Sequence, residues 1–227
     1  MTYDSATPPR ALAFDAYGTL FDVHAVTAAL EEHFPGRGRE LSERWRAKQL
    51  EYTWLLALMG RYHDFAWVTE RALIHACRSS GLALETETRR GLMALYLRLA
   101  PYPEVPAALE RLAGWPMIIL SNGSRKMLDT AVEDAGLGRR FAGIVSADRV
   151  STYKPSPRVY ALASEHLGVP TPEIGFVSSN GFDVAGAKAF GFQTFWLNRS
   201  GAVLDPLDLE PDGTLERLTD LADRIAG

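Results

Sequence analysis

The chain has 227 residues, of which 47% are hydrophobic and 23% charged, and its 24 basic and 28 acidic side chains give a net charge of −4. This length corresponds to about one and a half average domains, and the composition is that of a globular protein rather than a disordered, collagenous or coiled-coil one. The small negative charge argues against a nucleic-acid partner or a polybasic membrane anchor.

Neither end of the chain nor any apolar run predicts secretion or a membrane span. Residues 1–10 lack an apolar signal region, and the longest hydrophobic runs, such as 117–120, are far too short to cross a bilayer. Cys77 is the single cysteine and lies in an apolar helical stretch, which favours a buried side chain over a nucleophile. We therefore expect a cytoplasmic protein.

The first predicted element is a buried strand, because residues 11–15 form a short apolar run that ends in an aspartate. A glycine-containing loop follows. The pattern then becomes helical, and in one stretch Leu41, Trp45 and Tyr52 recur at helical spacing. The four helices expected in this segment span 24–34, 40–59, 66–80 and 85–99.

After Pro103 helices and short apolar strands alternate, which is typical of βαβ units and a parallel sheet. The expected helices span 104–113, 124–136, 156–167 and 183–190, and the strands between and after them span 116–120, 142–146, 174–178 and 193–197. A final helix is expected at 214–226, where one apolar stripe is formed by Leu215, Leu218, Leu221 and Ile225.

The fold class predicted from this order is α/β, a doubly wound parallel sheet with a helical subdomain inserted after the first strand. The core domain comprises 1–20 and 100–227, and the helical cap comprises 21–99. In such sheets ligands bind beyond the carboxyl ends of the strands. We therefore expect the functional residues at those ends.

Four segments that finish or follow strands carry polar side chains: FDAYGTL at 14–20, LSNGS at 120–124, TYKP at 152–155 and VSSNGFD at 177–183. Each segment alone is weak evidence. An aspartate after a strand is often a turn residue, a lysine before proline is usually solvated, and Ser-Asn-Gly is a common turn. Their combination and order are much more specific.

In this order the segments resemble the motifs of the haloacid dehalogenase superfamily, and the resemblance covers nearly the whole chain, including the inserted cap. The sequence is most similar to the L-2-haloacid dehalogenases, through the stretches FDAYGTLFDVH, FPGRGRE, KQLEYTWL, LRLAPY, LSNGS, YKP and FVSSN. This resemblance implies hydrolysis of short L-2-haloalkanoic acids to D-2-hydroxy acids, with inversion and without a metal or other cofactor.

The first and last motifs discriminate between the chemistries of this superfamily. Magnesium-dependent phosphatases carry a second aspartate two residues after the first, whereas here Tyr17 follows Asp15. The late loop offers one acid, Asp183, where phosphatases have adjacent or near-adjacent acids. Magnesium requires hard oxygen ligands, and too few are present. We therefore expect no metal site.

By resemblance, Asp15 is the nucleophile that displaces halide and forms an ester. Lys154 balances its charge, and Thr19 and Ser178 orient it. The ester is then hydrolysed by a water molecule that Asp183 positions or activates, with Lys154 and Asn180 as partners in the network. The alternative for Asp183 is a helix N-cap.

The remaining site residues are expected to bind the anionic substrate and the released halide ion. Arg46 and Asn122 match the family residues that donate hydrogen bonds to the halide. Ser121 matches the residue that binds the substrate carboxylate, and Tyr160 matches the residue that supports Lys154. An apolar wall is expected from Tyr17, Leu50, Phe65 and Phe182. Alone, Arg46 could equally be solvated surface, and Leu50 and Phe65 plain core. Relatives commonly have tryptophan at the position of Phe182 and leucine at the position of Ala16. Both differences change the pocket, so the sequence does not define which substrate sizes and halides are accepted.

Two other functions are compatible with parts of this pattern. A phosphatase or phosphonatase of the same fold would show magnesium-dependent turnover, and Tyr17 argues against it. A non-catalytic binder of small carboxylic acids would keep the pocket without needing a nucleophile. The apolar helix at 40–59, with Trp54, Leu55, Leu58 and Met59, could form a homodimer interface, although core packing explains it equally well.

Overall fold

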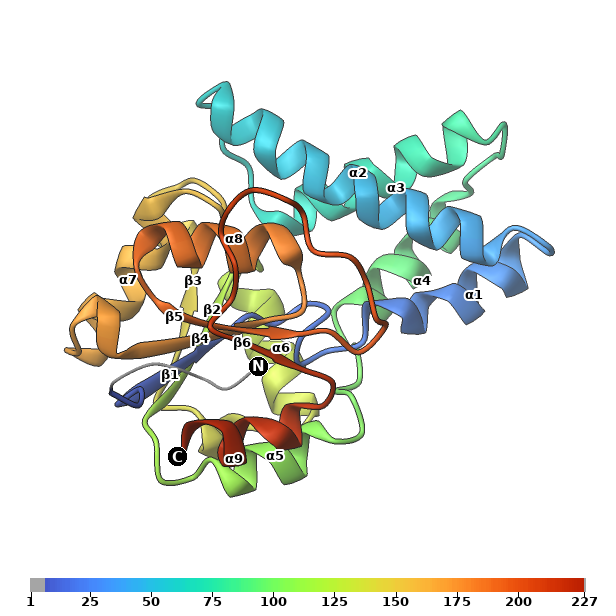
Figure 1. Ribbon diagram of the computed structural model, residues 1–227. Helices are drawn as coiled ribbons and strands as arrows, with labels where there is room; N and C mark the ends of the chain where they lie inside the picture. The colour runs from blue at the N-terminus through green and yellow to red at the C-terminus, as the bar shows by residue number, and fades with distance from the viewer. Residues whose placement is uncertain (1–6, 227) are drawn as a thin grey trace.

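The computed structural model describes residues 7–226. In this part of the chain six strands form one parallel sheet in the order β3-β2-β1-β4-β5-β6 (Figure 1). The strands are β1 Ala11–Phe14, β2 Met117–Ser121, β3 Gly143–Ser146, β4 Ile174–Ser178, β5 Gln193–Leu197 and β6 Gly213–Leu215. This arrangement confirms the predicted doubly wound parallel sheet.

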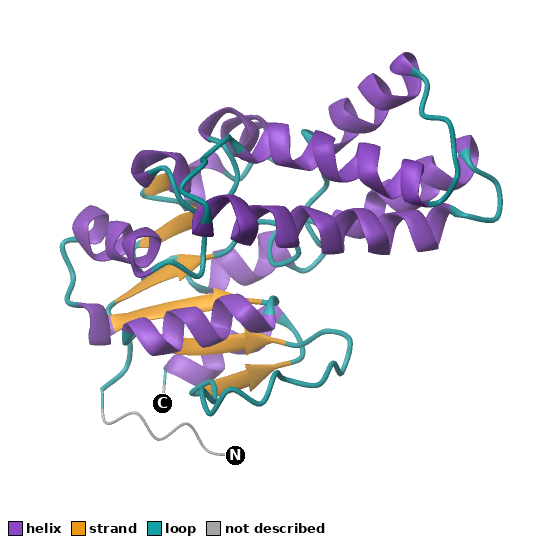
Figure 2. Ribbon diagram, turned by 90° about the horizontal axis from the view of Figure 1, so that it is seen from above, coloured by secondary structure: helices purple, strands orange, loops and turns teal. Residues whose placement is uncertain are grey.

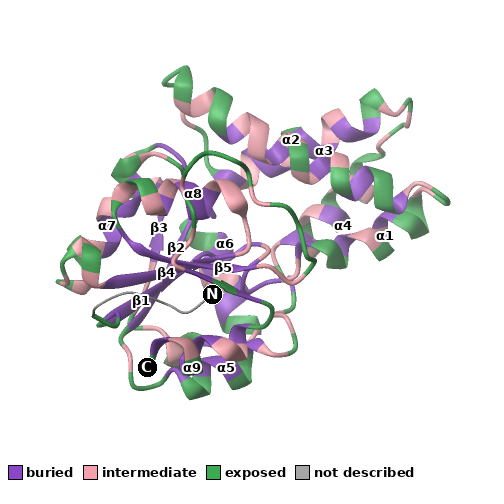
Figure 3. Ribbon diagram, viewed as in Figure 1, coloured by how far each residue is buried: buried purple, intermediate pink, exposed green. Residues whose placement is uncertain are grey.

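Helices cover both faces of this sheet, so its central strands are buried throughout (Figure 3). Because side chains alternate along a strand, Leu12 and Phe14 pack into one apolar layer and Ala13 into the other. The first layer includes α5 Val105–Arg111, α6 Arg125–Asp134 and α9 Leu221–Ile225, and the second includes α7 Pro157–Leu167 and α8 Gly181–Phe190.

Four further helices gather to one side of the sheet (Figures 1 and 2). They are α1 Val26–His33, α2 Gly38–Leu58, α3 Phe65–Ser79 and α4 Thr86–Tyr96. The buried Trp45 of α2 donates its indole N–H to the carbonyl of Thr69 in α3 at 2.8 Å, and Asp64 caps α3 by accepting from the Trp67 N–H at 2.8 Å. The first contact joins α2 to α3, and the second fixes the start of α3.

The chain leaves and re-enters the sheet region at one place, because Phe21 and Pro101 form an isolated β-bridge. This adjacency supports our proposal that 21–99 is an inserted cap and that 1–20 with 100–227 is the core. Among residues 7–226, no helix combines the length and the hydropathy that a bilayer span requires.

The predicted final helix at 214–226 is wrong in its first half. Gly213–Leu215 is the edge strand β6, a 3₁₀ turn follows at Leu218–Asp220, and only Leu221–Ile225 is α-helical. The whole apolar stripe is buried, as expected, but strand pairing with β5 determines the conformation of its first residue. Spacing of three or four residues does not distinguish these alternatives when the pairing partner is remote in sequence.

Candidate active site

Asp15 follows β1 directly, is 6% exposed, and has both carboxylate oxygens engaged. Oδ1 lies 3.2 Å from the Lys154 Nζ. Oδ2 accepts hydrogen bonds from Asn180 Nδ2 at 2.8 Å, from the Thr19 hydroxyl at 3.2 Å and from the Ser178 hydroxyl at 3.5 Å. These contacts fix the orientation of the carboxylate.

Lys154 is 1% exposed and bridges two carboxylates, because its Nζ also lies 2.9 Å from Asp183 Oδ2. Its backbone N–H donates to Asn122 Oδ1 at 2.8 Å, which links the 152–155 loop to the end of β2. The ammonium lies 4.8 Å from the centre of the Phe176 ring. Burial opposes the charged lysine, but the neighbouring Asp15 and Asp183 outweigh this effect and raise its pKa.

Asp183 lies in the first turn of α8 and is almost completely buried. Its Oδ1 accepts a hydrogen bond from the Tyr160 hydroxyl at 2.8 Å. Burial raises the pKa of Asp183 to about 6, while Lys154 opposes the shift and the negative charge of Asp15 adds to it. Asp183 can therefore change its protonation state near neutral pH, as a base that accepts a proton from water must.

Close packing and a left-handed turn shape the two loops nearest Asp15. Gly18 has φ +90°, a conformation that disfavours a side chain, and it allows the chain to turn back under Asp15. After β2, a Cβ at Gly123 would lie 2.7 Å from the Tyr17 ring, so glycine is required for the close approach of these loops. Ser121 accepts a hydrogen bond from the Gly123 N–H at 3.1 Å.

Arg46 projects from α2 of the proposed cap to the same site. One terminal nitrogen, Nη2, lies 3.2 Å from Asn180 Oδ1 and 3.3 Å from the Tyr17 carbonyl. The other, Nη1, donates to Gln49 Oε1 at 2.7 Å, and the Tyr96 hydroxyl donates to the same oxygen at 3.1 Å. Gln49 is thus an orienting partner of the arginine that the sequence analysis missed, although its i+3 spacing from Arg46 on a helix could have indicated it.

A small cavity of about 250 Å³ lies among these groups. Eleven of the fourteen predicted site residues line it: Asp15, Tyr17, Arg46, Leu50, Phe65, Ser121, Asn122, Lys154, Asn180, Phe182 and Asp183. The cavity combines cations, amide and hydroxyl groups with aromatic walls, which suits a small anionic molecule.

Three predicted site residues do not line the cavity. Thr19 and Ser178 lie behind Asp15, in positions that fit their expected orienting function. Tyr160 was placed with the substrate-binding residues as a support of the lysine. The structure instead joins its hydroxyl to the carboxylate of Asp183, because α7 and α8 pack together there.

Two polar groups that line the cavity have unused donors. The hydroxyl of Tyr17 is buried and makes no hydrogen bond to any residue between 7 and 226, and burial raises its pKa far above the usual value. Its ring stacks on Tyr96 at a centroid distance of 5.7 Å. The amide nitrogen of Asn122 likewise donates to no described residue. A buried, unpaired donor such as the Tyr17 hydroxyl favours a polar or anionic ligand.

Arg199 is a second residue that the sequence analysis missed. It follows β5 and donates to the carbonyls of Gly18 at 3.2 Å and Thr19 at 2.9 Å, and to the Ser179 hydroxyl at 3.2 Å. Glu104 holds the guanidinium from the other side at 2.7 Å. The residue thus ties together the loops after β1 and β4. The strand-end rule that found the other segments also applies to β5 and could have indicated Arg199.

Within the described range 7–226, no group of three or more His, Cys, Asp and Glu side chains is arranged to hold a metal ion. The position between the carboxylates of Asp15 and Asp183 is taken by the ammonium of Lys154. The sheet and the strand-end cluster together define a hydrolase site with an aspartate at its centre.

Comparison with known proteins identifies the class. The family model described as haloacid dehalogenase-like hydrolase matches residues 9–191. This match covers most of the chain, and the chain belongs to that family.

The chain is similar over nearly its full length to dehalogenases. An (S)-2-haloacid dehalogenase of Pseudomonas sp. strain YL is 49% identical over 223 residues, 96% of either chain. The (S)-2-haloacid dehalogenase H-109 of Pseudomonas putida is 45% identical over 95% of this chain and 97% of the relative. A solved L-2-haloacid dehalogenase from Xanthobacter autotrophicus with chloropropionic acid covalently bound has a TM-score of 0.91 and 40% identity, covering 96% and 99% of the two chains. These findings confirm the resemblance identified from the motifs.

Proposed function

We propose that this protein is an (S)-2-haloacid dehalogenase that converts short L-2-haloalkanoic acids to D-2-hydroxy acids through an ester on Asp15. The proposal rests on the environment of Asp15. Asp15 is a buried, fully oriented carboxylate that lines a small cavity, and Tyr17 replaces the acid that a phosphatase would need two residues later. The covalently bound chloropropionic acid in the Xanthobacter relative supports a covalent step in that protein.

In the first step a carboxylate oxygen of Asp15 attacks C2 of the substrate from the side opposite the halogen. The new C–O bond forms as the carbon–halogen bond breaks, and halide leaves with the bonding electrons. Attack from the back inverts C2. Lys154 balances the charge of Asp15 before the attack, and Thr19 and Asn180 restrict the carboxylate to its reactive orientation.

In the second step water attacks the carboxyl carbon of the Asp15 ester rather than C2. Asp183 accepts one proton of that water and returns it to the leaving oxygen as the acyl C–O bond breaks. The 2-hydroxy acid thus leaves with the oxygen that came from Asp15, and the re-formed Asp15 carboxyl releases the other proton to solvent. C2 is untouched, so the inversion persists in the product. The support for Asp183 is its 2.9 Å contact with Lys154 and a pKa near 6 that suits a base.

Negative charge develops on the leaving halide, and the substrate carboxylate is also negatively charged. Both require hydrogen-bond donors or cations nearby. Arg46 provides the cation on the cap side, with Gln49 holding its guanidinium. The unused donors of Asn122 and Tyr17 lie in the same cavity, as does Ser121. We assign halide binding to Arg46 and Asn122 and carboxylate binding to Ser121 and the amides of the 16–17 turn.

The proposal includes independence of metal ions. A divalent cation between Asp15 and Asp183 would have to displace the Lys154 ammonium, which already neutralises both carboxylates at 3.2 and 2.9 Å. The absence of an acid at Tyr17 removes a further oxygen ligand. A cytoplasmic location stays a prediction.

Halide release from the separate enantiomers of 2-chloropropionate tests the function. We expect release from the L isomer, in the presence of EDTA as in its absence, and D-lactate as the product by chiral chromatography. The Asp15→Asn variant is the control for enzyme-independent release. Turnover of neither isomer, or turnover that EDTA abolishes, would contradict the proposal.

A further inference from the structure

A second cavity adjoins the small one that contains Asp15. This groove has a volume of about 900 Å³, includes open solvent, and has a predominantly apolar lining. It lies between the C-terminal half of α2, the 152–156 segment and the start of α8. The residues that line it are Trp54, Ala57, Leu58, Thr152, Tyr153, Lys154, Pro155, Ser156 and Phe182.

Two residues belong to both cavities. Lys154 and Phe182 line the groove and the small cavity alike, so their side chains form the wall between them. Lys154 is fixed by its two carboxylate contacts. Phe182 is only half-buried and has no comparable ionic anchor, so we expect its ring to be the more easily displaced part of this wall.

Phe182 is held by one aromatic contact from the proposed cap. The ring of Trp54 meets it edge to face, with centroids 5.3 Å apart and planes at 75°. Trp54 is 36% exposed, so displacing it does not open the core. The Trp54–Phe182 contact therefore joins α2 to the first turn of α8 across the inner end of the groove.

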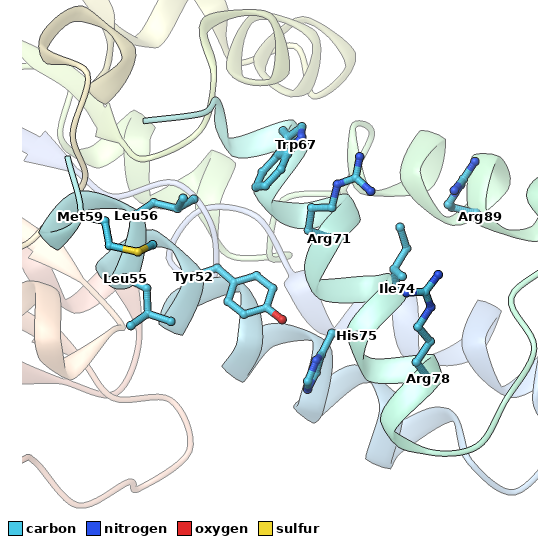
Figure 4. Close-up of a pocket in the computed structure, with 10 residues that line it drawn as sticks. All are labelled: Tyr52, Leu55, Leu56, Met59, Trp67, Arg71, Ile74, His75, Arg78 and Arg89. Atoms are coloured by element: carbon cyan, nitrogen blue, oxygen red, sulfur yellow. The ribbon is translucent and has the colours of Figure 1, made fainter. Parts of the chain in front are cut away.

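The other large cavities are less suitable routes to Asp15. The cavity drawn in Figure 4 lies between α2, α3 and α4 and shares no lining residue with the small one. A third cavity, beside the 205–209 segment, shares Phe182 alone. Of these three cavities, formed by residues within 7–226, the groove is the one that shares both Phe182 and Lys154 with the small cavity.

We propose that this groove is the access path and the binding site for the alkyl substituent of longer 2-haloacids, with the Trp54–Phe182 pair separating it from the reactive cavity. The inference rests on the proposed dehalogenase function. The carboxylate and halogen occupy the polar cavity beside Arg46 and Ser121. A chain extending from C3 has no room there and passes Phe182 into the apolar groove, where burial of its methylene groups is favourable.

The test compares kcat/KM for halide release from L-2-bromohexanoate and L-2-bromopropionate, taken as a ratio within each enzyme preparation. Trp54→Ala widens the path, so we expect this ratio to rise by about fivefold or more. Ala57→Phe fills the groove, so the ratio should fall by about as much. Because both rates come from one sample, partial loss of folded protein cancels from the ratio.

Ala47→Phe is the matched control, since Ala47 is exposed on the same helix and lines none of the cavities described above. It should leave the ratio unchanged. Ratios that stay within about twofold of wild type in both groove variants, or that shift equally in the control, would overturn the proposal. If wild type releases no halide from L-2-bromopropionate, the dehalogenase function itself is wrong, which is a separate result.

Discussion

At the scale of single residues, the proposed mechanism depends most on Asp15, whose carboxylate is held in place by four side chains. Replacing it by asparagine keeps the size of the side chain but removes the charged nucleophile. We expect Asp15→Asn to lower kcat on the order of 10⁴-fold or more, as loss of a nucleophile does elsewhere. Halide electrode measurements at high enzyme concentration would show this loss, and activity within tenfold of wild type would remove Asp15 from the mechanism.

If Asp183 is the base of the proposed second step, its pKa sets an acid limit for the reaction. Its burial raises the pKa to about 6, so the ionised form that accepts a proton from water is lost as the pH falls through that value. We expect kcat to fall by about tenfold for each pH unit below this pKa, which is the acid limb of the pH profile. Circular dichroism would exclude unfolding of the protein. A kcat that is flat from pH 7 to 4.5 would contradict the assignment.

Tyr160 tunes this limit through its hydrogen bond to Asp183. The bond stabilises the carboxylate and opposes the effect of burial on the pKa of Asp183. In Tyr160→Phe the acid limb of kcat should therefore move to higher pH, while activity well above the limb is retained. A merely structural function of Tyr160 would lower kcat equally at all pH values.

At the scale of elements, Arg199 connects loops that belong to different strands. Its planar guanidinium donates to three oxygens of the β1 and β4 loops, a pattern that a lysine ammonium cannot reproduce. We expect Arg199→Lys to lower kcat about tenfold with little change in KM, because Thr19 no longer aligns Asp15. The control is Arg217→Lys, an exposed pair with Asp220. Equal kcat values in the two variants would show that Arg199 does not position the loops.

The elements show which parts of the fold a sequence pattern can specify. β4 and β5 occur at the residues predicted, because each is a short apolar run bounded by turn residues. β6 was missed, since Gly213–Leu215 is a strand only by pairing with β5. The partners of Tyr160 and Arg199 were missed for the same reason: contacts between remote segments leave no local periodicity.

At the scale of the whole molecule, the proposed cap and core each supply part of the site. Arg46 and Leu50 come from α2, while Asp15 and Lys154 come from the sheet side. The core residues could be predicted because their motifs follow strands, where a parallel sheet brings residues together, whereas Arg46 on α2 was predicted only from the family resemblance. The motifs could not predict the groove, which depends on how α2 packs against α8.

The exposed apolar side chains of α2 divide between two faces. Trp54 and Leu58 line the groove, whereas Leu55 and Met59, at 43% and 59% exposure, lie outside it. Leu55 and Met59 line the cavity between α2 and α3 together with Tyr52 and Trp67 (Figure 4). We propose this second face as the interface of the homodimer suggested by the sequence, since burial of such a patch stabilises association.

Light scattering after size exclusion tests the dimer. We expect wild type at about twice the 25.0 kDa chain mass, and the double variant Leu55→Asp, Met59→Asp as a monomer, because two buried charges would oppose association. Leu207→Asp, on an exposed loop elsewhere, should remain dimeric. A monomeric wild type at micromolar concentration would exclude the interface.

The central claim is that water attacks an ester of Asp15 and not the substrate carbon. Single turnover of L-2-chloropropionate with excess enzyme in H₂¹⁸O, followed by mass spectrometry of peptides and product, tests it most directly. We expect ¹⁸O in the carboxylate of Asp15 and unlabelled D-lactate, because the product oxygen comes from Asp15. Lactate labelled in its hydroxyl group, with Asp15 unlabelled, would contradict the account.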